Sequence, residues 1–238
     1  MLTVREPEEI FQTDGAIQNG TFTGRWHFSF GAYFDPENTS FGALRVLNDD
    51  TLSPGATWPL HPHREIEVVT YCAGGEFRHA DEHGKGGVLK KGWVQHTTVG
   101  SGMWHSEINN RADEPMRFIQ MWFYPEKKGL PPSVEQRPVE KAERTDKLLA
   151  VVAPEGGGAL PIHADARVLS CFLEKDKTVG HRLAPGRGAY VYVLEGGPIK
   201  VNGNRVKLFG AAKAVGEEEV NITALEDTEM ILVEVAIS

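Results

Sequence analysis

Two histidines and a glutamate in the first third of the chain have the residue types and spacing of half a metal site. One proline separates His61 from His63, and Glu67 follows four residues after His63. The segment from Ile66 to Tyr71 has the apolar character of a strand. Because alternate side chains of a strand share one face, a continuous strand from His61 would bring the three side chains together. Neutral imidazoles beside a carboxylate are typical ligands of divalent transition metals.

His105 and Glu107 form a second candidate pair, again with the i, i+2 spacing that places both on one strand face. A lone pair of histidines such as His61 and His63, in a proline-bounded segment, would more often lie at the surface. The matching spacing of the two pairs favours a shared site, provided that their strands are neighbours. Three imidazoles and one carboxylate would leave positions open on a six-coordinate ion, as in catalytic rather than structural metal sites.

The residues around both pairs resemble the two sequence motifs of cupin proteins. Gly55, His61, His63, Glu67 and Gly74 match the first motif, and Gly102, His105 and Asn109 match the end of the second. Longer segments resemble the pirin family of two-domain cupins, and within it the bacterial members described as quercetin 2,3-dioxygenase-like. These segments are Phe41–Asp50, His61–Arg64 and Gly100–Glu107.

The resemblance implies an all-β fold of two tandem cupin barrels (double-stranded β-helix or jelly-roll barrels), with a metal site in the N-terminal barrel only. It implies His61, His63, His105 and Glu107 as the metal ligands. Glu67 and Glu107 compete for the carboxylate position, since typical cupins use the first-motif glutamate, whereas the pirin resemblance favours Glu107. Glu67 would then orient an imidazole through its free N–H or point elsewhere.

The resemblance also implies a metal-dependent dioxygenase that cleaves flavonols such as quercetin with O2, with Glu107 as the catalytic residue that accepts the proton of the substrate hydroxyl. The expected cofactor is one divalent transition metal per chain. Fe(II) is favoured, and zinc, nickel, cobalt, manganese and copper stay open because the ligand types do not choose among them. One alternative is a non-enzymatic, metal-dependent regulatory protein that binds transcription machinery, as described for pirins. Another is an isomerase or small-acid binder, because a fold does not fix a function.

The composition excludes several other classes. The chain has 238 residues and a formal net charge of −8, which argues against direct contact with nucleic acid. No apolar run is long enough to span a membrane, and the acidic start has no signal core, so we expect a cytoplasmic protein. Cys72 and Cys171 lie in separate predicted strands, which favours reduced thiols. Phosphate-binding glycine loops and the Gly-x-Ser-x-Gly motif are missing from the sequence. The oligomeric state stays open.

The elements that must position the ligands are short strand-like segments separated by turn residues, a pattern typical of β-sandwiches and barrels. In the first half they are Gly42–Leu47, His61–Tyr71, Glu76–His79, Val94–Val99, Met103–Ile108 and Met116–Phe123. In the second half they are Arg167–Glu174, Ala189–Leu194, Ile199–Val201, Arg205–Leu208, Val220–Leu225 and Met230–Ile237, with a hairpin turn at Asn202-Gly203. Tyr124–Lys147 is rich in proline and predicts a linker with a short helix near its end. We therefore expect an N-terminal domain over 1–138, which holds the metal site, and a C-terminal domain over 139–238.

The second half repeats the strand order of the first half without its ligands. Aligning Gly196 with Gly74 places the ligands of the first motif on Leu183, Pro185 and Ala189. No histidine stands in place of the second motif either. We therefore expect the second barrel to be structural, or to form one wall of the pocket.

Overall fold

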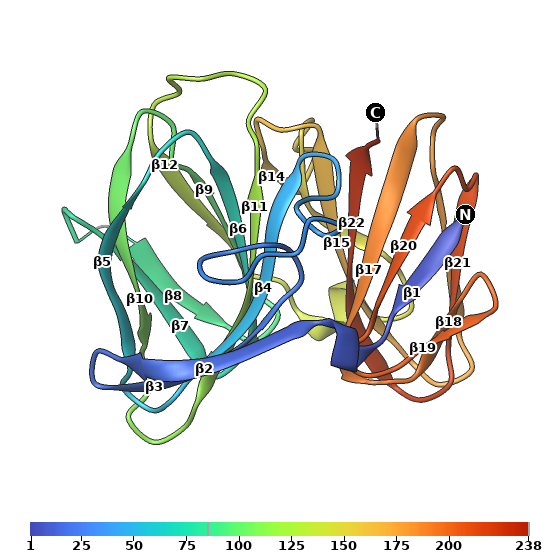
Figure 1. The fold of residues 1–238 in the computed structure, drawn as a ribbon, viewed down its shortest axis with the longest axis horizontal. Helices are drawn as coiled ribbons and strands as arrows, with labels where there is room; N and C mark the ends of the chain where they lie inside the picture. The colour runs from blue at the N-terminus through green and yellow to red at the C-terminus, as the bar shows by residue number, and fades with distance from the viewer. Residues whose placement is uncertain (85, 238) are drawn as a thin grey trace.

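The computed structural model describes residues 1–84 and 86–237, and it is built almost entirely from strands and turns. Figure 1 shows two β-barrels side by side, with the N-terminal barrel drawn mainly in blue and green and the C-terminal one from yellow to red. Each barrel contains one seven-stranded and one four-stranded sheet. The prediction of an all-β fold with two tandem barrels is confirmed. Closure into barrels satisfies the edges that these short strands would otherwise expose.

The first barrel is built from consecutive strands of the N-terminal half. They are β2 Phe11–Ile17, β3 Gly20–Trp26, β4 Leu44–Leu52, β5 Thr57–His63, β6 Glu67–Gly74, β7 Glu76–Asp81, β8 Gly86–Lys90, β9 Val94–Thr98, β10 Met103–Asn109, β11 Met116–Phe123 and β12 Ser133–Arg137. The large sheet has the order β12-β9-β6-β11-β4-β3-β2, and the small sheet has the order β5-β10-β7-β8. The strands that carry the two predicted ligand pairs, β5 and β10, are therefore direct neighbours.

The second barrel repeats this plan. Its strands are β1 Leu2–Arg5, β13 Leu149–Ala153, β14 Leu160–Pro161, β15 Ala166–Leu173, β16 Thr178–Arg182, β17 Arg187–Gly196, β18 Ile199–Val201, β19 Asn204–Val206, β20 Ala211–Val215, β21 Glu219–Ala224 and β22 Thr228–Ala236. The large sheet has the order β1-β20-β17-β22-β15-β13-β14, and the small sheet has the order β16-β21-β18-β19. Val201 pairs with Asn204 across Asn202 and Gly203, which confirms the predicted hairpin turn.

The two seven-stranded sheets pack against each other, and this contact contains the largest hydrophobic cluster of the described chain. Val69 and Tyr71 of β6 meet Tyr190, Tyr192 and other residues of the second barrel there. Side chains alternate between the faces of a strand, so every second residue of β6 points to the other barrel and the rest point into its own. The outer face of the first barrel is apolar, and the second barrel covers it.

One strand crosses between the barrels. β1 pairs with β20 of the second barrel, with Leu2 opposite Ala214 and Arg5 opposite Ala211, and Figure 1 shows it in blue among the orange and red strands. The predicted domain over 1–138 is therefore wrong for its first strand, because the edge of β20 is completed by backbone hydrogen bonds from the N-terminus. The rest of the predicted division stays a prediction.

The expected strand from His61 to Tyr71 is interrupted. β5 ends at His63 and β6 begins at Glu67, and Glu65 between them has a left-handed backbone with φ of 53°. Such a conformation disfavours a non-glycine residue and ends the regular pleat. The two strands continue in different sheets, so the assumption that Glu67 shares a strand face with His61 and His63 is wrong.

The helical content of residues 1–84 and 86–237 consists of single 3-10 turns, Pro7–Glu9 and Lys141–Glu143. The second of these lies where the sequence predicted a short helix. Neither turn has the length or apolar character that crossing a membrane as a helix requires.

Candidate metal centre

Three histidine rings converge inside the first barrel, on two neighbouring strands. His61 of β5 lies opposite His105 of β10, and His63 lies opposite Met103. The ring centroids of the three histidines are 4.7–4.9 Å apart. One nitrogen from each ring lies within 4.8 Å of the others. The register of one antiparallel strand pair therefore brings the three predicted histidines together.

Glu107 lies beside the three histidines, next to a bulge in the pairing of β10 with β5. His105 pairs with His61, and Glu107 pairs with Trp58. The two residues are two positions apart on β10, but their partners are three positions apart on β5, which is a bulge. Such a bulge re-aims side chains locally. Glu107 Oε2 lies 3.9 Å from His61 Nε2, and Glu107 Oε1 lies 3.7 Å from His105 Nε2. Ligands about 2.0–2.2 Å from one ion lie up to about 4.4 Å apart, so these separations suit a shared metal.

The hydrogen bonds of the histidine rings leave their Nε2 atoms available as metal ligands. His61 Nδ1 donates to the Pro59 carbonyl at 2.8 Å, which leaves the lone pair of Nε2 available. His105 Nδ1 lies 2.9 Å from His79 Nε2. The Nε2 atoms of His63 and His105 are buried and have no hydrogen-bond partner among the described residues. Buried polar atoms are rarely left unpaired. Two such atoms that face a carboxylate fit a metal ion.

The electrostatics of the site favour neutral imidazoles, the form that binds metals. Burial, together with the nearby His105 and His61, lowers the pKa of His63 to about 4. Burial, followed by the charge of His79, lowers the pKa of His105 to about 3. Both rings are therefore unprotonated at neutral pH and need not release a proton to coordinate a metal.

Gln120, which the sequence did not single out, holds Glu107 in place, and Trp122 in turn holds Gln120. Gln120 Nε2 donates to Glu107 Oε1 at 2.8 Å, and Trp122 Nε1 donates to Gln120 Oε1 at 2.9 Å. The Trp122 ring also packs on His63, with centroids 4.6 Å apart. Gln120 and Trp122 are two residues apart on β11, so their spacing alone placed them on the same face of a predicted strand. Nothing in their residue types indicated that this face lines the site.

Glu67, the other predicted carboxylate, lies on the face of β6 that points away from the interior of the first barrel and toward the second barrel. Its Oε2 accepts hydrogen bonds from His96 Nε2 at 2.7 Å, from Thr98 Oγ1 at 3.2 Å and from the His163 backbone at 3.2 Å. Residue 163 belongs to the second half of the chain, so Glu67 lies at the contact between the barrels. Burial raises its pKa, but hydrogen bonds and charges from His96 and His163 outweigh this and keep it below the usual value.

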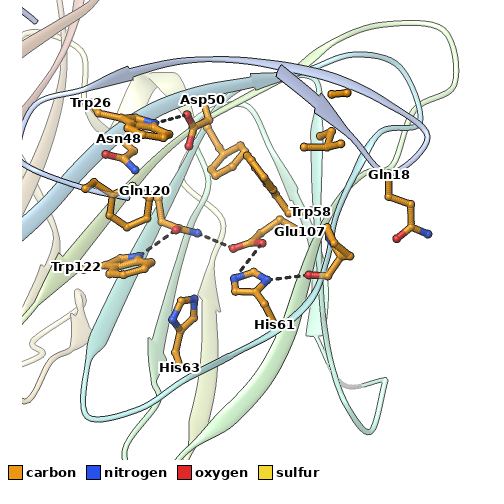
Figure 2. A pocket seen from close by; sticks show the side chains of 15 residues that line it. Gln18, Trp26, Asn48, Asp50, Trp58, His61, His63, Glu107, Gln120 and Trp122 are labelled. Atoms are coloured by element: carbon orange, nitrogen blue, oxygen red, sulfur yellow. Dashed lines mark hydrogen bonds and ion pairs between the residues drawn. The ribbon is translucent and has the colours of Figure 1, made fainter. Parts of the chain in front are cut away.

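A cavity of about 480 Å³ opens beside the four side chains. It is lined by Ala16, Ile17, Gln18, Trp26, Phe30, Asn48, Asp50, Trp58, Pro59, His61, His63, Glu107, Phe118, Gln120 and Trp122. Figure 2 shows His61, His63 and Glu107 at one part of this cavity, with Trp122 beside His63. The lining surface is mostly apolar and includes the aromatic rings of Trp26, Phe30, Trp58, Phe118 and Trp122, which suits a flat apolar ligand. All of its residues come from the first half, so the second barrel does not wall the pocket.

The second barrel has its own equivalent of His61. β16 and β21 occupy the places of β5 and β10, and His181 on β16 lies opposite Val220 on β21. Val220 lies four residues before the end of β21, as His105 does in β10. The alignment that placed His61 on Leu183 was therefore wrong by two residues. His181 Nε2 pairs with Glu234 at 2.6 Å, and valine offers no ligand atom at the position of His105.

Comparison with known proteins agrees with this architecture. Residues 10–123 match the pirin family, and residues 150–235 match the quercetinase C-terminal cupin domain. A pirin-like protein of Caulobacter vibrioides is 37% identical over 95% of this chain and 97% of its own length. A quercetin 2,3-dioxygenase of Escherichia coli K12 is 32% identical over 87% of this chain and 89% of its own.

Solved structures extend the similarity to three dimensions. The bacterial pirin YhhW of Escherichia coli, in complex with nickel(II), has a TM-score of 0.91 at 29% identity, with 100% of both chains covered. A second structure of YhhW gives a TM-score of 0.92, covering 100% of this chain and 99% of the other. The chain therefore belongs to the pirin family, with two cupin domains in tandem.

Proposed function

We propose that this protein is a metal-dependent dioxygenase that cleaves flavonols such as quercetin with O2. The observation that carries the proposal is the cluster of His61, His63 and His105 beside a cavity with several aromatic rings in its wall. Glu107, which lies 3.9 Å from His61 and 3.7 Å from His105, supports it. A relative that is 32% identical over most of both chains is named a quercetin 2,3-dioxygenase, which supports this substrate class. The cavity volume of about 480 Å³ is in the range of small-molecule sites.

The three histidines and Glu107 would hold one divalent transition metal. The similar pirin YhhW was solved in complex with nickel(II), which supports a divalent ion in this protein, and we favour Fe(II) as the native metal. When bound, the metal would act as a Lewis acid that lowers the pKa of a substrate hydroxyl and would offer open positions to reactants. The donor set of imidazoles and one carboxylate fits such an ion without further residues.

Within this site, we assign proton transfer to Glu107. Gln120 holds its Oε1, while Oε2 has no hydrogen-bond donor among the residues that the structure describes. Oε2 can therefore accept the proton of a flavonol hydroxyl. The side chain is only 3% exposed, so it is shielded from bulk water. The aromatic rings of Trp58 and Trp122 would hold the flat substrate against the site and exclude solvent.

We also propose that the activity is cytoplasmic. Cys72 and Cys171 are both buried and free, and such thiols persist in a reducing compartment. Fractionation of cells that express the tagged chain would test this, and recovery in a periplasmic or membrane fraction would contradict it.

The test of the proposed activity combines metal analysis with an oxygen electrode. Protein purified without added metal should carry one equivalent of metal and consume O2 with quercetin. The double variant His61→Ala, His63→Ala should lose both, whereas His83→Ala, an exposed histidine in the same barrel, should keep both. Turnover by the metal-free double variant would refute the proposal. Stoichiometric metal in the wild type without O2 uptake would also refute it and would leave the regulatory alternative.

A further inference from the structure

The motif around Asp50 contributes two polar side chains to the cavity that the proposed chemistry does not use. Asn48 and Asp50 alternate on β4 and therefore share its inward face. Across the sheet, Asn48 lies opposite Gln120, and Asp50 lies opposite Phe118. Both residues line the cavity that contains His61 and Glu107. They are the only lining residues of β4, and they form a polar patch in a mostly apolar wall.

These side chains are buried but incompletely hydrogen-bonded. The Asn48 amide is 3% exposed and makes no hydrogen bond to any residue in the described part of the chain, and its Oδ1 is fully buried. Asp50 is 6% exposed and accepts one hydrogen bond, from Trp26 Nε1 to Oδ1 at 3.1 Å. Leaving a buried polar group unpaired is unfavourable. An unpaired amide beside a half-paired carboxyl, both at a cavity wall, points to a ligand group that pairs with them.

The sheet is shaped to hold Asp50 in this position. Gly24 lies opposite Asp50 on β3. A Cβ atom at Gly24 would collide with Asp50 Oδ1 and would lie 2.9 Å from Trp26 Nε1. Glycine therefore makes room for the Trp26 indole to reach the carboxyl group. The arrangement is a built feature of two adjacent strands, β3 and β4, rather than a chance exposure of two polar residues.

The polar patch lies away from the candidate metal ligands. Figure 2 shows Asn48, Asp50 and Trp26 at one end of the cavity and His61 and His63 at the other. Glu107 and Gln120 lie between the two ends in the same view. A flat ligand whose metal-binding group faces the histidines would thus present its far ring to Asn48 and Asp50.

We propose that Asn48 and Asp50 recognise a hydroxyl group on the substrate ring remote from the metal centre. The pocket would accordingly select polyhydroxylated flat aromatic compounds over those whose only hydroxyl group faces the metal. A hydroxyl group both donates and accepts a hydrogen bond, and an amide beside a carboxyl group offers both partners. This inference rests on the proposed function, because it assumes that a flavonol-like molecule occupies the cavity.

The electrostatics agree with this geometry. Burial raises the pKa of Asp50 to about 8; the hydrogen bond from Trp26 opposes the shift, and the charges of Asp49 and Glu107 add to it. The carboxyl group is then largely protonated at neutral pH and can donate its proton to a substrate oxygen. A neutral acid also avoids placing a further negative charge beside Glu107.

The test compares two ligands that share the metal-binding group. Quercetin and 3-hydroxyflavone both carry the hydroxyl-ketone pair, but only quercetin has hydroxyl groups on the other rings. Binding to the nickel(II)-loaded protein would be measured by calorimetry without oxygen. Wild type should bind quercetin about tenfold more tightly than 3-hydroxyflavone, the range expected for one well-placed hydrogen bond. Asp50→Ala and Asn48→Ala should reduce this preference to less than about threefold.

A conservative variant and the wild type keep the inference testable if an alanine variant fails to fold. Asp50→Asn retains a donor and an acceptor, so it should keep the preference for quercetin. Equal affinity of wild-type protein for both ligands would overturn the inference while leaving the proposed function in place. Loss of the preference in Asp50→Asn, with metal content unchanged, would contradict the role of Asp50 as a donor. Absence of binding by either flavonol would overturn the proposed function and this inference together.

Discussion

His79 Nε2 lies 2.9 Å from His105 Nδ1 inside the first barrel. Both side chains are buried, and His105 Nε2 faces Glu107. For Nε2 to act as a ligand, the ring proton of His105 must sit on Nδ1 and be donated to His79. With a metal bound at Nε2, His79 would thus select the tautomer and orientation of His105, as partners of metal-bound histidines usually do.

Removing this acceptor should weaken metal binding. We expect His79→Leu to lower the metal affinity by about 10- to 100-fold, the usual effect of losing such a partner. His79→Gln, whose amide oxygen can accept the same proton, should restore part of the affinity. Competition with a coloured chelator would measure both variants, with His83→Ala as the control. Equal affinity in the leucine variant and the wild type would show that His79 only fills space.

Matched substitutions can distinguish the roles of Glu67 and Glu107, the two carboxylates that the sequence left as alternative metal ligands. Glu107→Gln removes the proton acceptor, and we expect O2 uptake with quercetin to fall by about 10²- to 10⁴-fold. Glu67→Gln should change uptake by less than about threefold, because Glu67 faces His96 and the second barrel. Oxygen-electrode rates normalised to metal content would decide. A larger loss in Glu67→Gln than in Glu107→Gln would reverse the assignment of the fourth ligand.

Glu67 should instead matter for stability. Its carboxylate is buried between the barrels and accepts hydrogen bonds from His96, Thr98 and the His163 backbone. We expect Glu67→Gln to lower the free energy of unfolding by about 1–3 kcal/mol at pH 7, since partners lose a charged acceptor. Urea denaturation of the metal-free protein would measure this.

The loss of unfolding free energy in Glu67→Gln should depend on pH in a defined direction. The pKa of Glu67 is lower in the folded protein than its usual value of 4.5. Its contribution is therefore fully present above about pH 4.5 and is lost as the pH falls through the folded-state pKa. The difference between wild type and Glu67→Gln should shrink as the pH falls below about 4.5. A difference that stays constant over this range would mean that the carboxylate charge is not what stabilises the contact.

The contribution of Asp50 to stability should depend on pH in the opposite direction. Its pKa is raised from 3.8 to about 8 by burial, with Asp49 and Glu107 as the nearby charged groups. Between these values the folded protein retains a proton that the unfolded chain has released, so stability falls as the pH rises. Asp50→Asn cannot titrate and should gain stability relative to wild type across this range, by at most about 1.4 kcal/mol per pH unit.

Denaturation of the metal-free wild type and Asp50→Asn at pH 5, 6.5 and 8 would test this prediction. The amide oxygen introduced by Asp50→Asn can still accept the hydrogen bond from Trp26, so packing should change little. A stability difference that does not vary with pH would indicate that Asp50 is ionised in the folded protein. It would also remove the electrostatic support for donation by Asp50 to a substrate hydroxyl.

The sequence by itself determined the class of fold and the residue types of the candidate metal site. Alternating short segments can bury one face only by pairing into sheets, and Asn202-Gly203 fixes a hairpin through local backbone preferences. The i, i+2 spacing of His61 with His63, and of His105 with Glu107, placed each pair on one strand face. These properties depend on neighbours within a few residues, so they can be read without the tertiary structure.

Several strands escaped prediction because their patterns depend on distant partners. β1, β2 and β3 lie in a region of weak alternation, and β1 forms by pairing with β20 at the other end of the chain. The end of β5 at His63 was hidden as well, since nothing in the residue types of Arg64–Ile66 signals a left-handed backbone. A segment with a polar or mixed composition becomes a strand when another strand supplies its hydrogen bonds.

Only the tertiary structure decided which carboxylate faces the histidines and which residues support them. Glu67 is one residue out of phase with the inward face of β6, and the second barrel covers the face that it occupies. His79 and Gln120 reach His105 and Glu107 because β7, β10 and β11 meet inside one barrel. These contacts depend on sheet register and closure, which link residues far apart in the chain, and local spacing carries no information about them.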